Sequence, residues 1–327
     1  MRRTIAVLCR DDHDRPPGLE ELTDRADVIY ATADTLPEAI ETADALFVWD
    51  FFSPAVRIAW PRARRLEWIH VASAGVDALL FDDLVGSEVL VSNARGVFDQ
   101  PIAEYVLAAI LAQAKQLYRS RDLQQAHRWQ HRETRSIAGM PVLVIGTGGI
   151  GRAIARLLRA AGMQVTGAGR RTATDDPDFG TVVDSARLVD HVGTVDHLVM
   201  AAPLTAQTTG MINADVLAAM RPGAHLINVG RGPSVDEDAV LQSLRSGHLG
   251  AASLDVFVDE PLADDHPFWD EPGMHISPHL SGDTEGWLDR LATQFVEQAD
   301  RWLDGRELIN IVDKQRGYAA PTGRGQQ

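Results

Sequence analysis

Residues 140–162 read MPVLVIGTGGIGRAIARLLRAAG, which places a buried-strand pattern, a glycine-rich turn and an amphipathic helix in direct succession. The turn has the spacing G-x-G-x-x-G. In that spacing the first glycine permits a tight bend, the second lets a pyrophosphate approach the backbone, and the third lets the helix pack on the strand. A purely structural turn could share the spacing, but the strand and the N-terminus of the helix favour a dinucleotide site. The predicted binding residues are Gly146, Gly148, Gly149, Ile150 and Gly151.

The end of the next predicted strand bears on the choice of dinucleotide. The sequence there is Gly169-Arg170-Arg171, and the first acidic residue after it is Asp175. A carboxylate at this position would accept hydrogen bonds from ribose hydroxyls and would repel a 2′-phosphate, whereas arginines bind a phosphate. The alternative is a solvated arginine pair on a loop. We therefore predict that Arg170 and Arg171 favour NADP, with NAD possible.

Short β-rich runs alternate with helical patterns along nearly the whole chain, which predicts parallel sheets covered by helices. The first series of predicted strands is Thr4–Cys9, Ala45–Trp49, Leu66–Val71 and Val89–Ser92, with helices at Gly18–Asp27, Leu36–Ala43 and Pro54–Trp60. The second series is Val142–Ile145, Gln164–Ala168, His197–Ala201, His225–Val229, Ala251–Val256 and His275–Ser277. Further helices are predicted from Pro101 and over Asp283–Leu303; Tyr118–Ser136 reads as a polar bridge, and the chain after Tyr318 as disordered.

Composition limits the classes of partner. The chain has 327 residues, which predicts two domains, and 31 basic against 46 acidic residues give a formal charge of −15. This charge argues against nucleic acid or an anionic membrane as a partner. All basic residues except Lys115 and Lys314 are arginines, a bias that genome composition or a salty habitat would each produce. With one cysteine, Cys9, in an apolar run and no secretory signal or membrane-length segment, we expect a reduced, cytoplasmic protein.

Three side chains that could take part in catalysis follow predicted strands of the second series. They are Arg231, Glu260 and His279. Because the carboxyl ends of parallel strands meet at one edge, we expect them to converge beside a bound nicotinamide. There Arg231 would hold a substrate carboxylate or polarise its carbonyl, and His279 would donate a proton. Glu260 would orient the imidazole and favour its charged form. Each alone has a plain structural explanation, but their occurrence together after a nucleotide loop favours chemistry.

Several motifs in this order resemble the D-isomer-specific 2-hydroxyacid dehydrogenases. They are Gly146–Gly151, Asn228-Val229-Gly230-Arg231-Gly232, Leu254-Asp255-Val256-Phe257 with Glu260-Pro261-Leu262, Ser277-Pro278-His279, His266-Pro267-Phe268-Trp269, and Ala202-Pro203-Leu204-Thr205 with Thr208. The resemblance implies that Arg231, Glu260 and His279 are catalytic. It implies cofactor contacts at Pro203, Thr208, Val229 and Asp255, the last near the nicotinamide amide. It also implies substrate contacts at Arg231, at His279 and at the backbone of Ala74, Gly75 and Val76.

The resemblance further implies the layout of the chain. A Rossmann cofactor domain, residues 97–282, would be inserted in a flavodoxin-like substrate domain of residues 1–96 and 283–327, both doubly wound α/β sheets. Members are commonly homodimers through the cofactor domains, which fits the excursion at Tyr118–Ser136. Gly169-Arg170 departs from the acidic residue that most members have there, so NAD specificity is not carried over.

These predictions converge on a reductase. Residues 310–318 resemble the glyoxylate/hydroxypyruvate reductase branch, which generally uses NADPH. We expect direct hydride transfer to a small 2-oxo acid, giving the D-2-hydroxy acid without a metal. The alternatives are an NAD-linked dehydrogenase of the phosphoglycerate or lactate type, and a non-catalytic module that senses dinucleotides.

Overall fold

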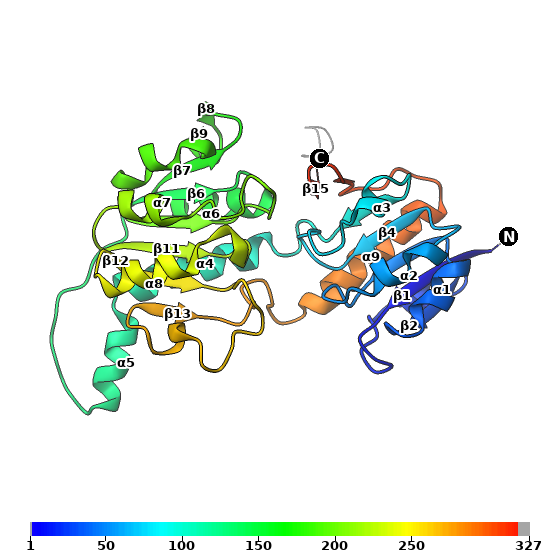
Figure 1. Ribbon diagram of the computed structural model, residues 1–327, viewed down its shortest axis with the longest axis horizontal. Helices are drawn as coiled ribbons and strands as arrows, with labels where there is room; N and C mark the ends of the chain where they lie inside the picture. The colour runs from blue at the N-terminus through cyan, green and yellow to red at the C-terminus, as the bar shows by residue number, and fades with distance from the viewer. Residues whose placement is uncertain (1, 320–327) are drawn as a thin grey trace. The chain divides into compact units, whose positions relative to one another are not determined.

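The computed structural model describes residues 2–319, which divide into two compact units (Figure 1). Unit 1 comprises the chain up to residue 98 and from residue 284 onward, and unit 2 comprises residues 99–283. The boundaries predicted from the sequence lie at 96/97 and 282/283. The assignment of substrate and cofactor to the two units stays a prediction.

Unit 1 is built on a parallel sheet with strand order β2-β1-β3-β4-β5. The strands are β1 Arg3–Leu8, β2 Ala26–Ala31, β3 Ala45–Val48, β4 Trp68–Val71 and β5 Leu90–Asn93, with a short hairpin of β14 Val312–Asp313 and β15 Tyr318–Ala319. The helices are α1 Leu36–Thr42, α2 Ala55–Ala59, α3 Asp82–Val85 and α9 Trp287–Leu303, with 3₁₀ turns at Leu19–Leu22 and Trp60–Arg62. This strand order is that of flavodoxin-like sheets, as predicted.

Helix α9 belongs to unit 1 although it follows all of unit 2 in the sequence. Its Phe295 stacks on Phe47 of β3, with ring centroids 3.9 Å apart, and on Trp68 of β4 at 5.6 Å. Aromatic packing of this kind adds about 0.5–1.5 kcal/mol per pair beyond area burial. The helix begins at Trp287, not at Asp283 as predicted, because Gly286 before it has φ 73°.

The predicted helix over residues 18–27 is wrong. Only Leu19–Leu22 forms a 3₁₀ turn, and the residues from Ala26 onward form β2, which pairs with β1. Asp27 and Ile29 of this edge strand are exposed, whereas the central strands β3 and β4 are buried throughout. The run Val28-Ile29-Tyr30 is typical of a strand, and pairing with β1 extends that strand back to Ala26.

Unit 2 is built on a sheet with strand order β13-β12-β11-β10-β6-β7-β9-β8. The strands are β6 Pro141–Ile145, β7 Gln164–Gly169, β8 Ala173–Asp176, β9 Gly180–Asp184, β10 His197–Met200, β11 Ala224–Asn228, β12 Leu249–Leu254 and β13 Met274–Ile276. The helices are α4 Asp99–Ala114, α5 Leu117–Gln125, α6 Gly149–Ala160, α7 Ala214–Ala219 and α8 Glu237–Arg245, with 3₁₀ turns at Ser185–Asp190, Val192–Thr194, Gly232–Ser234 and Pro267–Asp270. Apart from the antiparallel edge strand β8, this is the Rossmann order, which confirms the predicted fold class.

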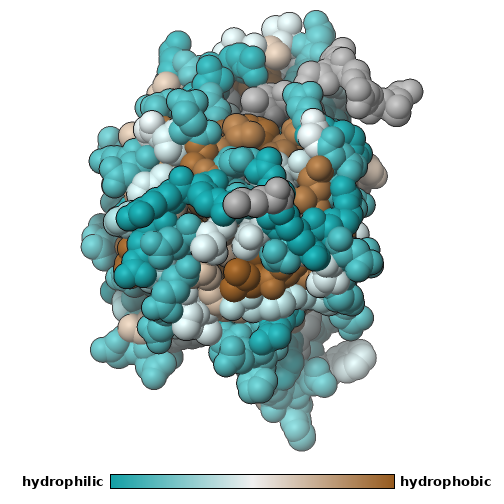
Figure 2. Space-filling view, turned by 90° about the vertical axis from the view of Figure 1, so that its right-hand side faces the viewer, coloured by the Kyte–Doolittle hydropathy of each residue, from teal (hydrophilic) through white to brown (hydrophobic). Residues whose placement is uncertain are grey.

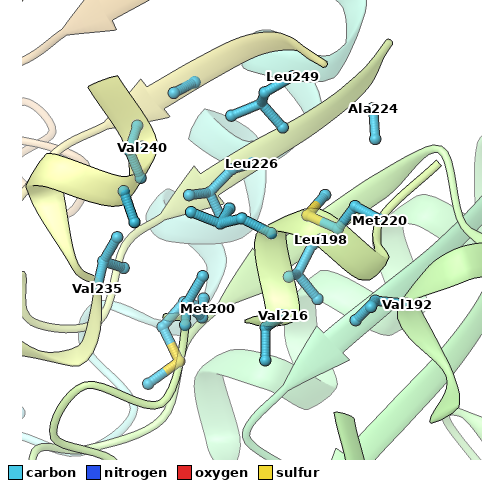
Figure 3. Packing of buried hydrophobic residues seen from close by; sticks show 14 of the residues in the cluster. Val192, Leu198, Met200, Val216, Met220, Ala224, Leu226, Val235, Val240 and Leu249 are labelled. Carbon is cyan, nitrogen blue, oxygen red and sulfur yellow. The ribbon is translucent and has the colours of Figure 1, made fainter. Parts of the chain in front are cut away.

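A dense apolar cluster fixes the strands of unit 2 in place. Leu198 of β10 and Leu226 of β11 are both 0% exposed, and Val240 of α8 and Val216 of α7 pack in the same cluster (Figure 3). Burying a leucine side chain contributes about 1.5–3 kcal/mol. Because Leu198 and Leu226 lie within the strands, their burial holds the strand ends beyond them at fixed positions.

The predicted polar bridge over Tyr118–Ser136 is helical in its first part. Helix α5 covers Leu117–Gln125, and the chain that follows has no regular structure up to residue 136. Figure 1 shows this segment standing away from the sheet of unit 2. Its Trp129 is 101% exposed.

The surface and the chain end complete the description. The face in Figure 2 is mostly hydrophilic with smaller apolar areas, as a formal charge of −15 leads one to expect. Within residues 2–319, no helix combines the length and the apolar character that crossing a membrane requires. Of the tail predicted after Tyr318, Ala319 pairs in β15, and the rest lies outside the described residues.

Candidate functional site

The carboxyl edge of the unit 2 sheet gathers most of the residues predicted to act in function. Strands β6, β7 and β10 to β13 are parallel, so their carboxyl ends share one edge. The strand order reverses between the neighbours β6 and β10, and a reversal of this kind opens a crevice for ligands. The predicted residues that follow these strand ends are Gly146, Arg170, Pro203, Arg231, Asp255 and His279.

The glycine loop after β6 has the form that a dinucleotide requires. Gly146 has φ 107°, and a Cβ there would lie 2.8 Å from the carbonyl of Ala201. A Cβ on Gly151 would lie 1.8 Å from the Gly146 oxygen, whereas one on Gly148 would meet nothing within 4 Å. Packing therefore explains the first and third glycines, and open space in front of the backbone explains the second. Since Gly148 is also the N-cap of α6, the loop fits a pyrophosphate.

Asp99 at the start of α4 is a neighbour of this loop that the sequence did not reveal. A Cβ on Gly149 would come within 2.4 Å of the Asp99 Oδ2 atom. The carboxylate therefore lies against the first turn of α6, where the partial charge of the helix favours an anion. Ile150 occupies the next position of that turn.

Arg170 and Arg171 lie on the connection between β7 and β8, and both are exposed. A Cβ on Gly169, the last residue of β7, would lie 3.0 Å from the side chain of Thr147. The connection therefore leaves the sheet beside the glycine loop. That is where the adenosine end of a dinucleotide lies in a Rossmann fold.

His279 and Glu260 form a close pair. The Nδ1 atom of His279 lies 2.8 Å from Glu260 Oε2, and the two side chains are 33% and 30% exposed. The other carboxylate oxygen of Glu260 accepts the N–H of Phe257 at 2.9 Å. Burial raises the pKa of Glu260, but the hydrogen bonds from His279 and Phe257 and the charges of His279 and Arg231 outweigh it and lower the pKa.

The turn that carries Arg231 packs against the loop of Glu260. A Cβ on Gly232 would lie 1.9 Å from the carbonyl of Phe257, so only glycine fits there. Asn228 fixes the turn, since its Oδ1 accepts the Gly230 N–H and its Nδ2 donates to the Arg231 carbonyl, each at 3.0 Å. The structure therefore places Arg231 and the His279–Glu260 pair in one region of unit 2.

Asp255 holds the turn on which His279 lies. Its carboxylate accepts hydrogen bonds from the Ser277 hydroxyl at 2.5 Å and from the N–H groups of Leu280 and Ser281 at 3.0 and 2.9 Å. The His279 N–H donates to the Asp255 carbonyl at 2.8 Å. His279 has φ 52°, a conformation that costs a non-glycine residue free energy and that these bonds maintain.

Tyr105 and Ser277 are site residues that the sequence reasoning missed. The Tyr105 hydroxyl lies 2.6 Å from Ser277 Oγ, so helix α4 is linked through Ser277 to Asp255. Burial raises the pKa of Tyr105 to about 12, which keeps the phenol protonated as a donor. Tyr105 lies far from the motif of Ser277 in sequence, so no local pattern connects them.

The remaining predicted cofactor residues lie at the ends of β10 and β11. The Thr208 hydroxyl donates to the Pro203 carbonyl at 2.7 Å and accepts the Thr205 N–H at 2.8 Å, which closes the turn after β10. Val229 is 6% exposed, and its N–H donates to the Met200 carbonyl at 2.9 Å. Both therefore shape the edge around the glycine loop.

The predicted substrate loop belongs to unit 1, where it follows β4. Asn93 Nδ2 donates to the Ala74 carbonyl at 2.6 Å, the Ser73 hydroxyl donates to the Gly75 carbonyl at 2.5 Å, and Val76 is 2% exposed. The carbonyls are thus bound within the loop. This arrangement is compatible with backbone N–H groups that bind an anion.

The single cysteine, Cys9, is buried directly after β1. Burial and the charge of Asp14 raise the pKa of its thiol to about 12. Because the thiolate is the nucleophile, this environment favours the structural interpretation of Cys9.

Comparisons with known proteins agree with this arrangement. Residues 107–281 match the family model described as the NAD binding domain of D-isomer specific 2-hydroxyacid dehydrogenases. The chain is 31% identical to glyoxylate/hydroxypyruvate reductase A of Serratia proteamaculans, over 78% of this chain and 82% of that one. It is 34% identical to (S)-sulfolactate dehydrogenase of Chromohalobacter salexigens, over 71% and 76%.

A solved structure extends the likeness to the fold. The NADPH-dependent glyoxylate/hydroxypyruvate reductase of Sinorhizobium meliloti, in complex with NADP and sulfate, superposes with a TM-score of 0.83 at 28% identity. The match covers 97% of this chain and 100% of that one. Both units therefore have counterparts in a known protein.

Proposed function

The chain belongs to the D-isomer specific 2-hydroxyacid dehydrogenases, which are NAD(P)-dependent oxidoreductases, and on that premise we propose that it reduces a small 2-oxo acid with NADPH. The product is the D-2-hydroxy acid, and glyoxylate and hydroxypyruvate are the proposed substrates. The similarity to glyoxylate/hydroxypyruvate reductase A of Serratia proteamaculans supports the choice of these substrates.

The observation that carries the proposal is the His279–Glu260 pair, with Nδ1 and Oε2 2.8 Å apart at the carboxyl edge of the unit 2 sheet. Glu260 engages Nδ1 of the imidazole, so we assign the donated proton to Nε2. Glu260 also fixes the orientation of the imidazole ring through this contact. Arg231 binds the substrate carboxylate as a forked donor and orients the carbonyl toward His279.

The cofactor supplies the hydride when it is bound. The glycine loop and the N-terminus of α6 hold its pyrophosphate, and Arg170 and Arg171 hold the 2′-phosphate. Pro203, Thr208 and Val229, at the ends of β10 and β11, would contact the cofactor, and so would Asp255, beyond β12. In unit 1, the backbone N–H groups of Ala74, Gly75 and Val76 are the proposed substrate contacts.

The test is kcat/KM for a panel of 2-oxo acids, each with NADPH and with NADH. The panel comprises glyoxylate, hydroxypyruvate, its 3-phosphate, pyruvate and sulfopyruvate. We expect the highest value for glyoxylate or hydroxypyruvate with NADPH. A higher value for another acid or with NADH would establish one of the NAD-linked alternatives or another substrate, and no turnover with any acid would favour a dinucleotide-sensing module.

A double variant tests the cofactor assignment separately. Replacing Arg170 and Arg171 by Ala is expected to weaken NADPH binding at least tenfold, because two charge-assisted contacts are lost, and to change NADH binding little. The matched control replaces the exposed Arg62 and Arg64 of unit 1 by Ala, which removes the same charge elsewhere. An equal loss for both cofactors in the first variant would contradict the assignment.

We propose that the protein acts as a homodimer through α5 and the segment that follows it. Leu117, Tyr118 and Trp129 are 54%, 45% and 101% exposed there, an apolar surface that a second copy would cover. Trp129→Glu is then expected to lower the mass in solution to that of a monomer. Val189→Glu, at a 50% exposed site outside the segment, is the control and is expected to leave the mass unchanged.

A further inference from the structure

Three arginines on one face of α6 bind a single acidic turn. Arg152, Arg156 and Arg159 recur at helical spacing, and their partners are Asp176 at the end of β8 and Asp178 in the turn to β9. Arg156 Nη1 lies 3.3 Å from the Asp178 carboxylate, and Arg159 Nη1 donates to the Asp178 carbonyl at 2.9 Å. The β8–β9 hairpin is therefore fastened to the helix that begins at the glycine loop.

Arg152 makes the strongest of these contacts. Its two terminal nitrogens bind the two oxygens of Asp176 at 2.9 and 2.8 Å, and Nη1 also lies 2.8 Å from Asp178 Oδ2. Asp176 Oδ1 further accepts the N–H groups of Asp178 and Phe179. The hydrogen bond from Arg152, against the opposing effect of burial, lowers the pKa of Asp176 to about 2. The Asp176 carboxylate is therefore ionised at neutral pH, and Arg152 contacts both carboxylates.

Phe179 connects this network to β7. The Arg152 guanidinium lies 5.5 Å from the centroid of the Phe179 ring. A Cβ on Gly167 of β7 would lie 2.9 Å from that ring, so the ring packs directly on the strand backbone. Arg152, Phe179 and the two aspartates therefore form one packed cluster beside β7, the strand that leads into Arg170 and Arg171.

The connection that carries Arg170 and Arg171 runs between two fixed ends. At one end, Gly169 lies against Thr147 of the glycine loop. At the other, β8 pairs with β9 through Ala173–Val182 and Asp176–Gly180, and Asp176 is bound to Arg152. A short segment anchored at both ends loses little further conformational entropy when it binds a ligand.

We propose that Arg152 is a specificity-determining positioning residue for the 2′-phosphate of NADPH, which it never touches. It holds the Arg170–Arg171 connection through Asp176, and it neutralises two carboxylates that would otherwise repel a phosphate nearby. This inference rests on the proposed use of NADPH. It explains how a loop followed closely by three aspartates, Asp175, Asp176 and Asp178, can still favour an extra phosphate.

The test compares Arg152→Met with Arg187→Met. Methionine keeps an apolar stem over Phe179 but loses the charge. Arg187 is the control because its side chain is 71% exposed and forms an ion pair with Asp190, which is also exposed. We measure the Kd of NADPH and of NADH by calorimetry. Arg152→Met is expected to raise the Kd of NADPH about tenfold and that of NADH less than about twofold. Arg187→Met is expected to change neither Kd.

A second measurement separates this inference from the proposed function. Hydrogen exchange of the peptide covering residues 168–176, without cofactor, is expected to rise in Arg152→Met and not in Arg187→Met. Unchanged exchange in Arg152→Met, or an equal loss of affinity for NADPH and NADH, would overturn the positioning role. If instead the Arg170/Arg171 double variant binds NADPH normally while exchange rises in Arg152→Met, the cofactor assignment fails and the anchoring of the loop stands.

Two further variants keep the test decisive. If Arg152→Met does not fold, Arg152→Lys retains a charge but loses the bidentate contact, and the same differential loss of NADPH is expected at smaller size. Adding Asp176→Asn and Asp178→Asn to Arg152→Met removes the released charges and is expected to restore part of the NADPH affinity. No recovery would show that the two carboxylates do not act on the phosphate, which contradicts that half of the proposal.

Discussion

Unit 2 contains a histidine–glutamate pair and a histidine–histidine pair, and comparing them shows how the surroundings of an imidazole determine its role. His279 lies beyond the end of β13, with its Nδ1 2.8 Å from the Glu260 carboxylate and a side chain that is one-third exposed. His197 and His225 lie inside neighbouring strands β10 and β11, 3% and 1% exposed, with their Nδ1 atoms 3.3 Å apart. The chemistry of the side chain is the same in both places.

The interior of the sheet lowers the pKa of both strand histidines. Burial lowers the pKa of His197 to about 4, and burial together with the charges of His197 and His275 lowers that of His225 well below its ordinary value. Both are therefore neutral at pH 7, and His225 satisfies its Nε2 with Ser253 Oγ at 2.9 Å. A histidine at a strand end with a carboxylate partner can exchange a proton, whereas one within the sheet serves as an uncharged polar core residue.

Removing the imidazole at the strand end gives the largest expected effect. His279→Gln should lower kcat about 1,000-fold, because general acid catalysis is lost, with cofactor affinity unchanged. His197→Gln, in the buried pair, should keep kcat within about twofold of the parent. Steady-state kinetics and cofactor titration of both variants check this, and comparable kcat values would mean that the exposed pair is no catalytic unit.

Loosening the turn under His279 should have a smaller effect. Ser277→Ala removes the hydroxyl that links Tyr105 to Asp255, a hydrogen bond to a charged group worth about 2 kcal/mol, or about 30-fold in kcat. KM should change little, since Ser277 is not expected to touch substrate. Ser277→Thr restores the hydroxyl and should recover most of the rate, whereas a loss in KM alone, or no rescue by threonine, would count against a positioning role.

The sequence was sufficient for features that residue type determines locally. The glycine loop could be predicted because Gly146 needs a positive φ and Gly151 tolerates no Cβ. Arg231 and His279 could be placed at one edge because parallel strands align their ends. These constraints act within a few residues of the motif.

Features that depend on a tertiary partner were not predictable. Arg152 and Asp176 are separated by 24 residues, and nothing near either predicts their contact. Strand β2 was not predicted, and the helix predicted over residues 18–27 runs into its first two residues, because pairing with β1 decides the conformation there. The contact between His197 and His225, which join neighbouring strands 28 residues apart in sequence, likewise appears only when the sheet is formed.

The buried pair itself predicts how stability depends on pH. An unfolded histidine binds a proton below about pH 6.5, whereas native His197 does so only near pH 4, so the unfolded state binds more protons in between. The free energy of unfolding should therefore fall as the pH decreases from about 6.5 to about 4, by about 1.4 kcal/mol per pH unit for each such histidine. His197→Gln should reduce that slope by one histidine's share, which urea unfolding of the variant and the parent at pH 7, 6 and 5 measures. Parallel slopes for the two proteins would show that His197 is already protonated in the folded state, and the distinction between the two pairs would then fail.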